Sequence, residues 1–228
     1  MKSWVLPKAG ARFVAKMEDV LTVYQRPYDP KRPVVCLDEI LKLLRSTPRG
    51  GIPTKPGQPA RIDYEYKREG QCALFLAVEP LAGFREVWVS DQRRKVDFAD
   101  VLRDLVDIHY RDADCVVLVC DNLNIHHAAA LYEAFPPQEA RRIAARIEWH
   151  YTPEHASWLN IAECELSVLA RQALKGRLAD KATVTEKACA WKERRNRLQV
   201  GVDWQFTTDD ARIKLRRLYP IVNVQDAP

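Results

Sequence analysis

The spacing of apolar side chains alternates along the chain between the period of a helix and the short continuous runs of buried strands. From Ala11 to Tyr24 apolar residues recur every three or four positions, which predicts a helix. Three prolines between positions 27 and 33 prevent that helix from continuing. The apolar, β-branched run Val34 to Leu37 then predicts a buried strand, which we expect to end at Asp38 and Glu39.

The middle of the chain predicts a hairpin followed by a crossover to a parallel strand. Seven Pro and Gly residues between Thr47 and Pro59 exclude a helix or a central strand, so this segment is expected to be a loop. The runs Gln71 to Val78 and Glu86 to Ser90 are typical of two antiparallel strands. An amphipathic helix from Phe98 to Val106 leads to the apolar run Cys115 to Cys120, and this order favours a parallel neighbour.

Helical spacing returns after this strand. Helices are expected at Ala128 to Phe135 and Pro137 to Arg146, and a last short strand at Ile147 to Tyr151. Strands, helix, strand, helices and strand in this order suit an α/β fold of the RNase H-like type, with a mixed sheet flanked by helices.

The remainder, beyond Trp158, is expected to be helical to the end. Thr183 and Glu186 have the spacing of a capping box, and a final helix from about Asp209 should stop at Pro220. The expected organisation is an N-terminal helix and linker over residues 1–30, a catalytic domain over 31–220 and a tail over 221–228.

Composition and charge narrow the class of protein. The chain is 47% hydrophobic and 29% charged, which is ordinary for a globular protein, and it has no long apolar window and no signal-like start. These features predict a cytoplasmic protein with no membrane partner. The six cysteines are scattered singly without zinc spacing, so we interpret them as reduced core residues.

The positive charge of the chain is concentrated in one segment. Residues 171–197 hold nine Lys or Arg against three Asp or Glu, whereas the rest of the chain, with 27 basic and 28 acidic residues, is nearly neutral. A basic segment of this kind, with Arg194, Arg195 and Arg197 near its end, is what attraction to DNA phosphates requires. A solvated helix face is the alternative, and this pattern leaves both open.

Acidic residues follow two of the predicted buried strands. Asp38 and Asp121 each stand at the carboxyl end of a strand, where ligand groups collect in open α/β sheets, and a following helix carries both Glu163 and Glu165. Both glutamates flank the apolar stripe of that helix, so its periodicity does not choose between them. Crowded carboxylates are typical of a site for Mg²⁺, although turn or capping roles would also account for each acid.

Three blocks of sequence carry a more specific signal. The stretches Tyr28 to Glu39, Asp121 to His126 and His155 to Glu163 resemble the three catalytic blocks of bacterial mariner-type insertion-sequence transposases, which belong to the DDE endonuclease superfamily. The resemblance extends from about Trp4 to Pro220, nearly the whole chain.

This resemblance implies an RNase H-like catalytic domain whose triad is Asp38, Asp121 and Glu163, which selects Glu163 over Glu165. It also implies Mg²⁺ or Mn²⁺, as two ions, held by the same three residues. The expected activity is DNA transposition: cleavage at the ends of an element and transfer of the freed 3′-hydroxyl to target DNA, so double-stranded DNA is the expected partner.

Other residues of these blocks are candidates for supporting roles. Asn122, His126 and His155 could contact DNA phosphates, support a metal ligand or serve as hydrogen-bonded structural residues. Trp158, beside the third block, is a further candidate DNA contact. Ala156 stands where the family more often has glycine, which would strain the loop if that position needs a positive φ.

The resemblance also sets expectations about partners. Family members usually carry helix-turn-helix segments before the core, and no such segment is recognised before Asp38, so we expect a split-gene product, a truncated copy or a separately encoded DNA-binding half. A homodimer on DNA is expected because two ends must be paired. The alternatives are a catalytically idle DNA-binding remnant and an RNase H-like nuclease or resolvase without strand transfer.

Overall fold

The computed structural model describes residues 10–49, 51–61 and 64–221 and has a five-stranded mixed sheet in the order β3-β2-β1-β4-β5. The strands are β1 (Val34–Ser46), β2 (Lys67–Glu79), β3 (Phe84–Ser90), β4 (Val116–Cys120) and β5 (Ile147–Tyr151). The helices are α1 (Ala11–Tyr24), α2 (Lys95–Asp104), α3 (Ala129–Ala134), α4 (Pro137–Ala144), α5 (Ile161–Gln172), α6 (Lys181–Arg197) and α7 (Thr208–Lys214), with single π-helical or 3₁₀ turns at Leu105–His109, Ser157–Leu159 and Arg216–Leu218. The strand β2 is antiparallel to both of its neighbours, β1 and β3, and β4 and β5 run parallel to β1. The predicted hairpin and parallel crossover are therefore confirmed.

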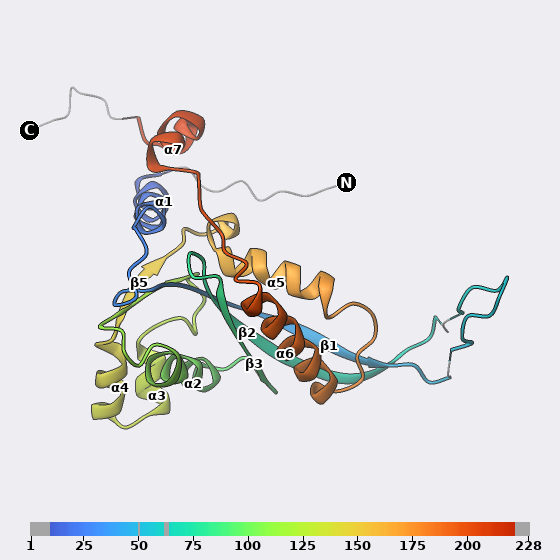
Figure 1. Cartoon of the computed structure of the whole chain (residues 1–228). Coiled ribbons are helices and arrows are strands. Elements are labelled where there is room, and N and C mark those ends of the chain that lie inside the picture. Colours follow the sequence, from blue (N-terminus) through green and yellow to red (C-terminus); the bar gives the residue numbers. More distant parts are fainter. Residues whose placement is uncertain (1–9, 50, 62–63, 222–228) are drawn as a thin grey trace, which may run out of the picture.

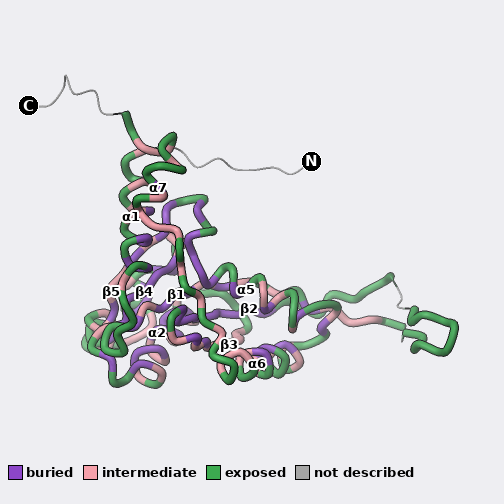
Figure 2. The backbone as a smooth tube through the Cα atoms, turned by 45° about the horizontal axis from the view of Figure 1, so that its top comes forward, coloured by how far each residue is buried: buried purple, intermediate pink, exposed green. Residues whose placement is uncertain are grey.

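Alternate residues of the strands belong to two separate cores, one on each side of the sheet. Figure 1 shows the helices that pack around the sheet, and Figure 2 colours the buried parts of the backbone purple. Cys36 points to a core made with α1, α5 and α6, whereas its neighbours Val35 and Leu37 point to a core made with α2, α3 and α4. Because α1 contributes six buried residues to the first core, it is part of the same packed unit as the sheet.

The strand β1 is longer than its sequence predicts. It runs through Asp38 and on to Ser46 because β2 pairs with it along that whole length. Its parallel partner β4 pairs only as far as Cys36, so Asp38 lies where β1 has just lost one neighbour. The predicted strand end at Asp38 is wrong, but the loss of one neighbouring strand still leaves this residue at an edge.

Two further expectations for the C-terminal part are corrected. Helix α6 begins at Lys181 rather than after Thr183, because Asp180 is the N-cap and accepts a hydrogen bond from the Thr183 N–H at 2.7 Å. The chain is extended, not helical, between α6 and α7. The capping box of the region lies instead at Thr207 and Asp210, at the start of α7.

The segment between β1 and β2 projects away from the rest of the molecule (Figure 1). In its described residues it has only isolated bridges, Ile52 with Arg61 and Lys55 with Gln58, which agrees with the loop predicted there. The predicted tail, 221–228, lies outside the described residues except for Ile221. None of the described helices is both long and apolar enough to cross a bilayer.

Candidate active site

Asp38 is held at the edge of the sheet by two hydrogen bonds. Its Oδ1 accepts from the backbone N–H of Glu39 at 2.8 Å and its Oδ2 accepts from Nδ2 of Asn160 at 3.2 Å. Burial, together with the nearby carboxylates of Glu39 and Asp121, raises the pKa of Asp38 to about 7, although the hydrogen bond from the Glu39 N–H and the charge of His126 act in the opposite direction. The carboxylate is therefore fixed in place by neutral donors, and no cation of the described residues forms an ion pair with it.

Asp121 follows β4 directly and is oriented by a buried histidine. His126 is fully buried, and its Nδ1 lies 2.6 Å from Oδ1 of Asp121 while its Nε2 lies 2.8 Å from Oε2 of Glu39. Burial alone would lower the pKa of His126, but these two carboxylates raise it to about 9. Burial likewise opposes ionisation of Asp121, but the hydrogen bonds from His126 and from the Leu123 N–H lower its pKa overall. An imidazolium thus bridges the two carboxylates.

The third block places two glutamates of α5 on different sides of the helix. Asn160 is the N-cap, and its Oδ1 accepts from the Ala162 N–H at 3.1 Å, so the amide that orients Asp38 also starts the helix. Glu163 is exposed in the first turn. Glu165 is buried and pairs with Arg85, whose Nε is 2.6 Å from its Oε2, and with Arg195 at 2.9 Å.

Asp38, Asp121 and Glu163 line one open cavity of about 360 Å³. Of its twelve lining residues four are acidic, the fourth being Glu154, and none is Lys or Arg. Carboxylate oxygens without a protein cation are the donors that a hard divalent ion takes, so these residues fit Mg²⁺ or Mn²⁺ by their chemistry. As the side chains stand, no three His, Cys, Asp or Glu of the described residues are close enough together to hold a metal ion.

With this geometry established, similarity to known proteins assigns the family. The family model described as "DDE superfamily endonuclease" matches residues 33–185, about two thirds of the chain. The chain belongs to this family. The match covers residues 33–39 of the first sequence block and all of the second and third, so the resemblance seen in the sequence is confirmed. No curated protein is similar enough in sequence to count as a match.

Solved structures similar to this DDE-family chain share its fold. The Mos1 mariner paired-end complex with Mn matches with a TM-score of 0.57 and 17% identity over 88% of this chain and 61% of that chain. The Mos1 strand transfer complex matches with the same TM-score and identity over 60% of its chain, and the Mos1 paired-end complex with Mg matches with a TM-score of 0.54 over 63% of its chain. At this identity the likeness confirms the RNase H-like fold, and this chain spans about three fifths of the length of those proteins.

The residues predicted to support the DDE-family site have different environments. His126 is buried, so it has no exposed atom for DNA and has instead the hydrogen-bonded role beside Asp121. Asn122 lines the cavity but donates to the Thr152 carbonyl at 2.5 Å and accepts from Nζ of Lys16 at 2.6 Å. His155 is exposed and lines the cavity.

The remaining two residues with predictions for this site, Ala156 and Trp158, lie in the loop that leads into α5. Ala156 has a negative φ of −120°, so the strain expected from replacing glycine there is absent, and the positive φ of 60° falls on His155 instead. Trp158 is 40% exposed and stacks on Trp204, with ring centroids 6.4 Å apart. It lies in the short turn between the cavity residues Ser157 and Asn160.

The three arginines predicted to bind DNA are also not equivalent. Arg195 is engaged by the buried Glu165 and its guanidinium lies over the ring of Trp191 at 5.3 Å, so it stabilises the packing of α6. Arg194 and Arg197 are exposed on the last turns of α6. Arg194 and Arg195, but not Arg197, line a second open cavity, described below.

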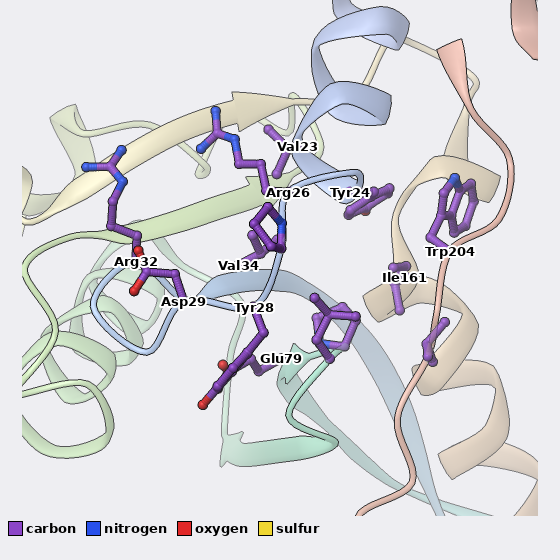
Figure 3. A pocket seen from close by; sticks show the side chains of 14 residues that line it. Val23, Tyr24, Arg26, Tyr28, Asp29, Arg32, Val34, Glu79, Ile161 and Trp204 are labelled. Atoms are coloured by element: carbon purple, nitrogen blue, oxygen red, sulfur yellow. The ribbon is translucent and has the colours of Figure 1, made fainter. Parts of the chain in front are cut away.

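A small cavity lies at the end of α1, away from the carboxylates (Figure 3). It is lined by Tyr24, Tyr28, Glu79 and Trp204, among others, and has room for about one water molecule. Oε1 of Glu79 is buried without a hydrogen-bond partner among the described residues, and burial raises the pKa of this carboxyl. The space is too small for a nucleotide, so it is not a substrate site.

Proposed function

We propose that this chain is the catalytic domain of a transposase, which cleaves DNA and transfers a 3′ end with the aid of divalent metal ions held by Asp38, Asp121 and Glu163. The observation that supports this proposal is the shared cavity of these three side chains, which contains no lysine or arginine to balance them. Membership of the DDE endonuclease family supports the same reaction class.

In this proposal the residues of the chain bind and orient, and none acts as a nucleophile. Two divalent ions, when bound, stabilise the attacking and leaving oxygens of a phosphodiester exchange. Asn160 and His126 hold Asp38 and Asp121 in fixed orientations, which favours binding because the ligands need little rearrangement. Glu163, exposed at the first turn of α5, lines the same cavity and would supply the third carboxylate of the ligand set.

The proposed partner is double-stranded DNA, with two copies of the chain acting on paired ends. The Mos1 structures that share this fold are paired-end and strand-transfer complexes, and this is the support for both parts of the proposal. A separately encoded helix-turn-helix half remains a prediction from the sequence.

The proposal is tested first by titrating the chain with Mn²⁺ and then by incubating it with supercoiled plasmid and a labelled 3′-hydroxyl oligonucleotide duplex. We expect saturable Mn²⁺ binding, nicking and joined products. Asp121→Ala should lose the binding and reduce cleavage by on the order of 10³-fold, since several kcal/mol of charge stabilisation are removed. The control is Glu133→Gln, which replaces an exposed acid of α3 that does not line the cavity, and it should behave as wild type.

Three outcomes would count against the proposal. Equal Mn²⁺ binding and nicking by wild type and Asp121→Ala would remove the metal-site assignment. Metal-dependent cleavage without joined products would replace strand transfer by the nuclease or resolvase alternative. If wild type neither binds Mn²⁺ nor cleaves DNA, the result would favour the catalytically idle remnant.

A further inference from the structure

A basic groove lies between the end of α5 and the exposed side of α6, two helices that run beside one another over the same face of the sheet (Figure 1). It has a volume of about 760 Å³ and eleven lining residues, of which none is acidic. Its five cations are Arg171, Lys175, Lys187, Arg194 and Arg195.

Most of these cations have no carboxylate of the protein to neutralise them. Arg195 pairs with Glu165, but the other four make no ion pair with an acid in the described part of the chain. All four of them are exposed. Nη1 of Arg171 donates to Oγ of Ser167 at 2.6 Å, a neutral partner that leaves its charge unbalanced. The groove therefore has a local positive charge that an anion from outside could neutralise.

The groove is connected to the carboxylate cavity along one exposed stripe of α5. Glu163, Ser167 and Arg171 are spaced by four residues, so they lie on the same side of the helix, and all three are exposed. The helical rise between them places Arg171 about 12 Å from Glu163 along the axis. A duplex that has one phosphate at the carboxylates would have phosphates roughly three to four base pairs away at the groove, at ~3.4 Å per base pair.

We propose that this groove binds the phosphate backbone of the same DNA duplex that the carboxylate cavity cleaves, flanking the reacting phosphate. This inference rests on the proposed function and adds a separate contact that needs no metal ion. An acidic protein segment would also satisfy the charge, but the exposed stripe from the groove to the cavity favours the substrate itself. Arg195, fixed by Glu165 and Trp191, positions one wall of the groove.

The test is duplex binding without metal. Binding of a fluorescent duplex of about 30 base pairs, of mixed sequence, is measured in EDTA at several KCl concentrations, for wild type, Lys187→Gln/Arg194→Gln and the matched control Arg111→Gln/Arg141→Gln. The control removes the same charge from exposed residues on the opposite side of the sheet, where α4 lies. Since each phosphate contact contributes about 0.9 to the slope of log K against log salt, the groove variant should lower that slope by about 2 and the affinity by roughly tenfold.

Equal slopes for the groove variant and the control would overturn the inference. A groove variant that loses binding to poly-L-glutamate but binds DNA as the control does would assign the groove to an acidic protein partner, which also overturns it. Because the measurement contains no metal, its result is independent of cleavage, and a failure of the metal-site proposal leaves the comparison of the groove variant with its control unchanged. Far-UV circular dichroism of each variant shows that the fold is retained.

Discussion

Two carboxylates of α5 that are only two residues apart in sequence have opposite environments. Glu165 is buried, and two arginines lie within 2.9 Å of its oxygens. Glu163 is exposed in a cavity that it shares with Asp38 and Asp121, and no Lys or Arg lines that cavity.

The difference lies in how each negative charge is balanced. Around Glu165 the fold supplies its own cations, and Arg85 also donates to the carbonyls of Gly83 and Val200, so this buried cluster is held together within the chain. Beside the cavity the buried His126 bridges Asp121 and Glu39, and Asp38 is left without a cation at ion-pair distance in the described part of the chain. A charge balanced within the chain indicates a structural role, and an unbalanced one indicates a ligand from outside.

The largest expected effect comes from breaking the balanced cluster. Arg85→Met leaves Glu165 with one partner and two carbonyls without their donor, so we expect the free energy of unfolding to fall by about 3 to 5 kcal/mol. Urea unfolding is the measurement. The double variant Arg85→Met/Glu165→Leu should recover part of the loss because it leaves no buried carboxylate in this cluster.

Glu163→Gln is the matched comparison on the same helix. As an exposed side chain without an ion pair among the described residues, it should change the free energy of unfolding by no more than about 0.5 kcal/mol. If Arg85→Met were as mild as Glu163→Gln, the distinction between the two glutamates would be wrong.

A smaller effect is expected from Glu39, which does not line the cavity but orients it. Glu39 accepts from Nε2 of His126, whose Nδ1 fixes Asp121, so Glu39→Ala should weaken Mn²⁺ binding by about 10- to 100-fold without removing a ligand. Glu39→Gln keeps an acceptor and should restore most of the affinity. The control is Glu133→Ala, which removes the same charge from an exposed position. An unchanged Mn²⁺ dissociation constant in Glu39→Ala would contradict this role.

Local sequence patterns predict the helices and strands well, but they fail where residues far away in the sequence determine the bounds of an element. The bounds of α1 and β5 agree with the sequence because apolar periodicity and nearby prolines determine them. The length of β1 depends on pairing with β2, which begins about twenty positions after β1 ends, so the apolar run alone wrongly predicts an end at Asp38 and Glu39.

The candidate site, too, could be predicted only in part from local sequence patterns. Periodicity leaves Glu163 and Glu165 equivalent, because the two arginines that pair with Glu165 lie 80 residues earlier, in β3, and 30 residues later, in α6. The resemblance selects Glu163, which lines the cavity with Asp38 and Asp121, and its catalytic role stays a prediction. Sequence reasoning missed the part of Asn160 in orienting Asp38, although an asparagine just before an apolar helical run is a local sign of an N-cap.

A further effect concerns the cost of the unbalanced charge itself. Because burial and neighbouring acids raise the pKa of Asp38 to about 7, the folded protein binds a proton there more tightly than the unfolded chain, whose carboxyl titrates near ~4. In EDTA this contribution should make wild type lose stability as pH rises from about 4 through 7. Asp38→Asn cannot ionise, so its stability relative to wild type should increase by roughly 2.5 kcal/mol between about pH 5 and 8, mostly below pH 7.

Asp112→Asn is the control for this pH dependence, since it makes the same substitution at a side chain that is 94% exposed. Its stability relative to wild type should be the same at both ends of that pH range. The quantity compared is the change in the free energy of unfolding with pH, not its absolute value. This separates the effect of ionisation from that of the hydrogen bonds with Asn160 and the Glu39 N–H, which Asp38→Asn would also alter. If the Asp38→Asn curve ran parallel to wild type, the carboxylate would already be balanced within the chain, and the cavity would resemble the Glu165 cluster after all.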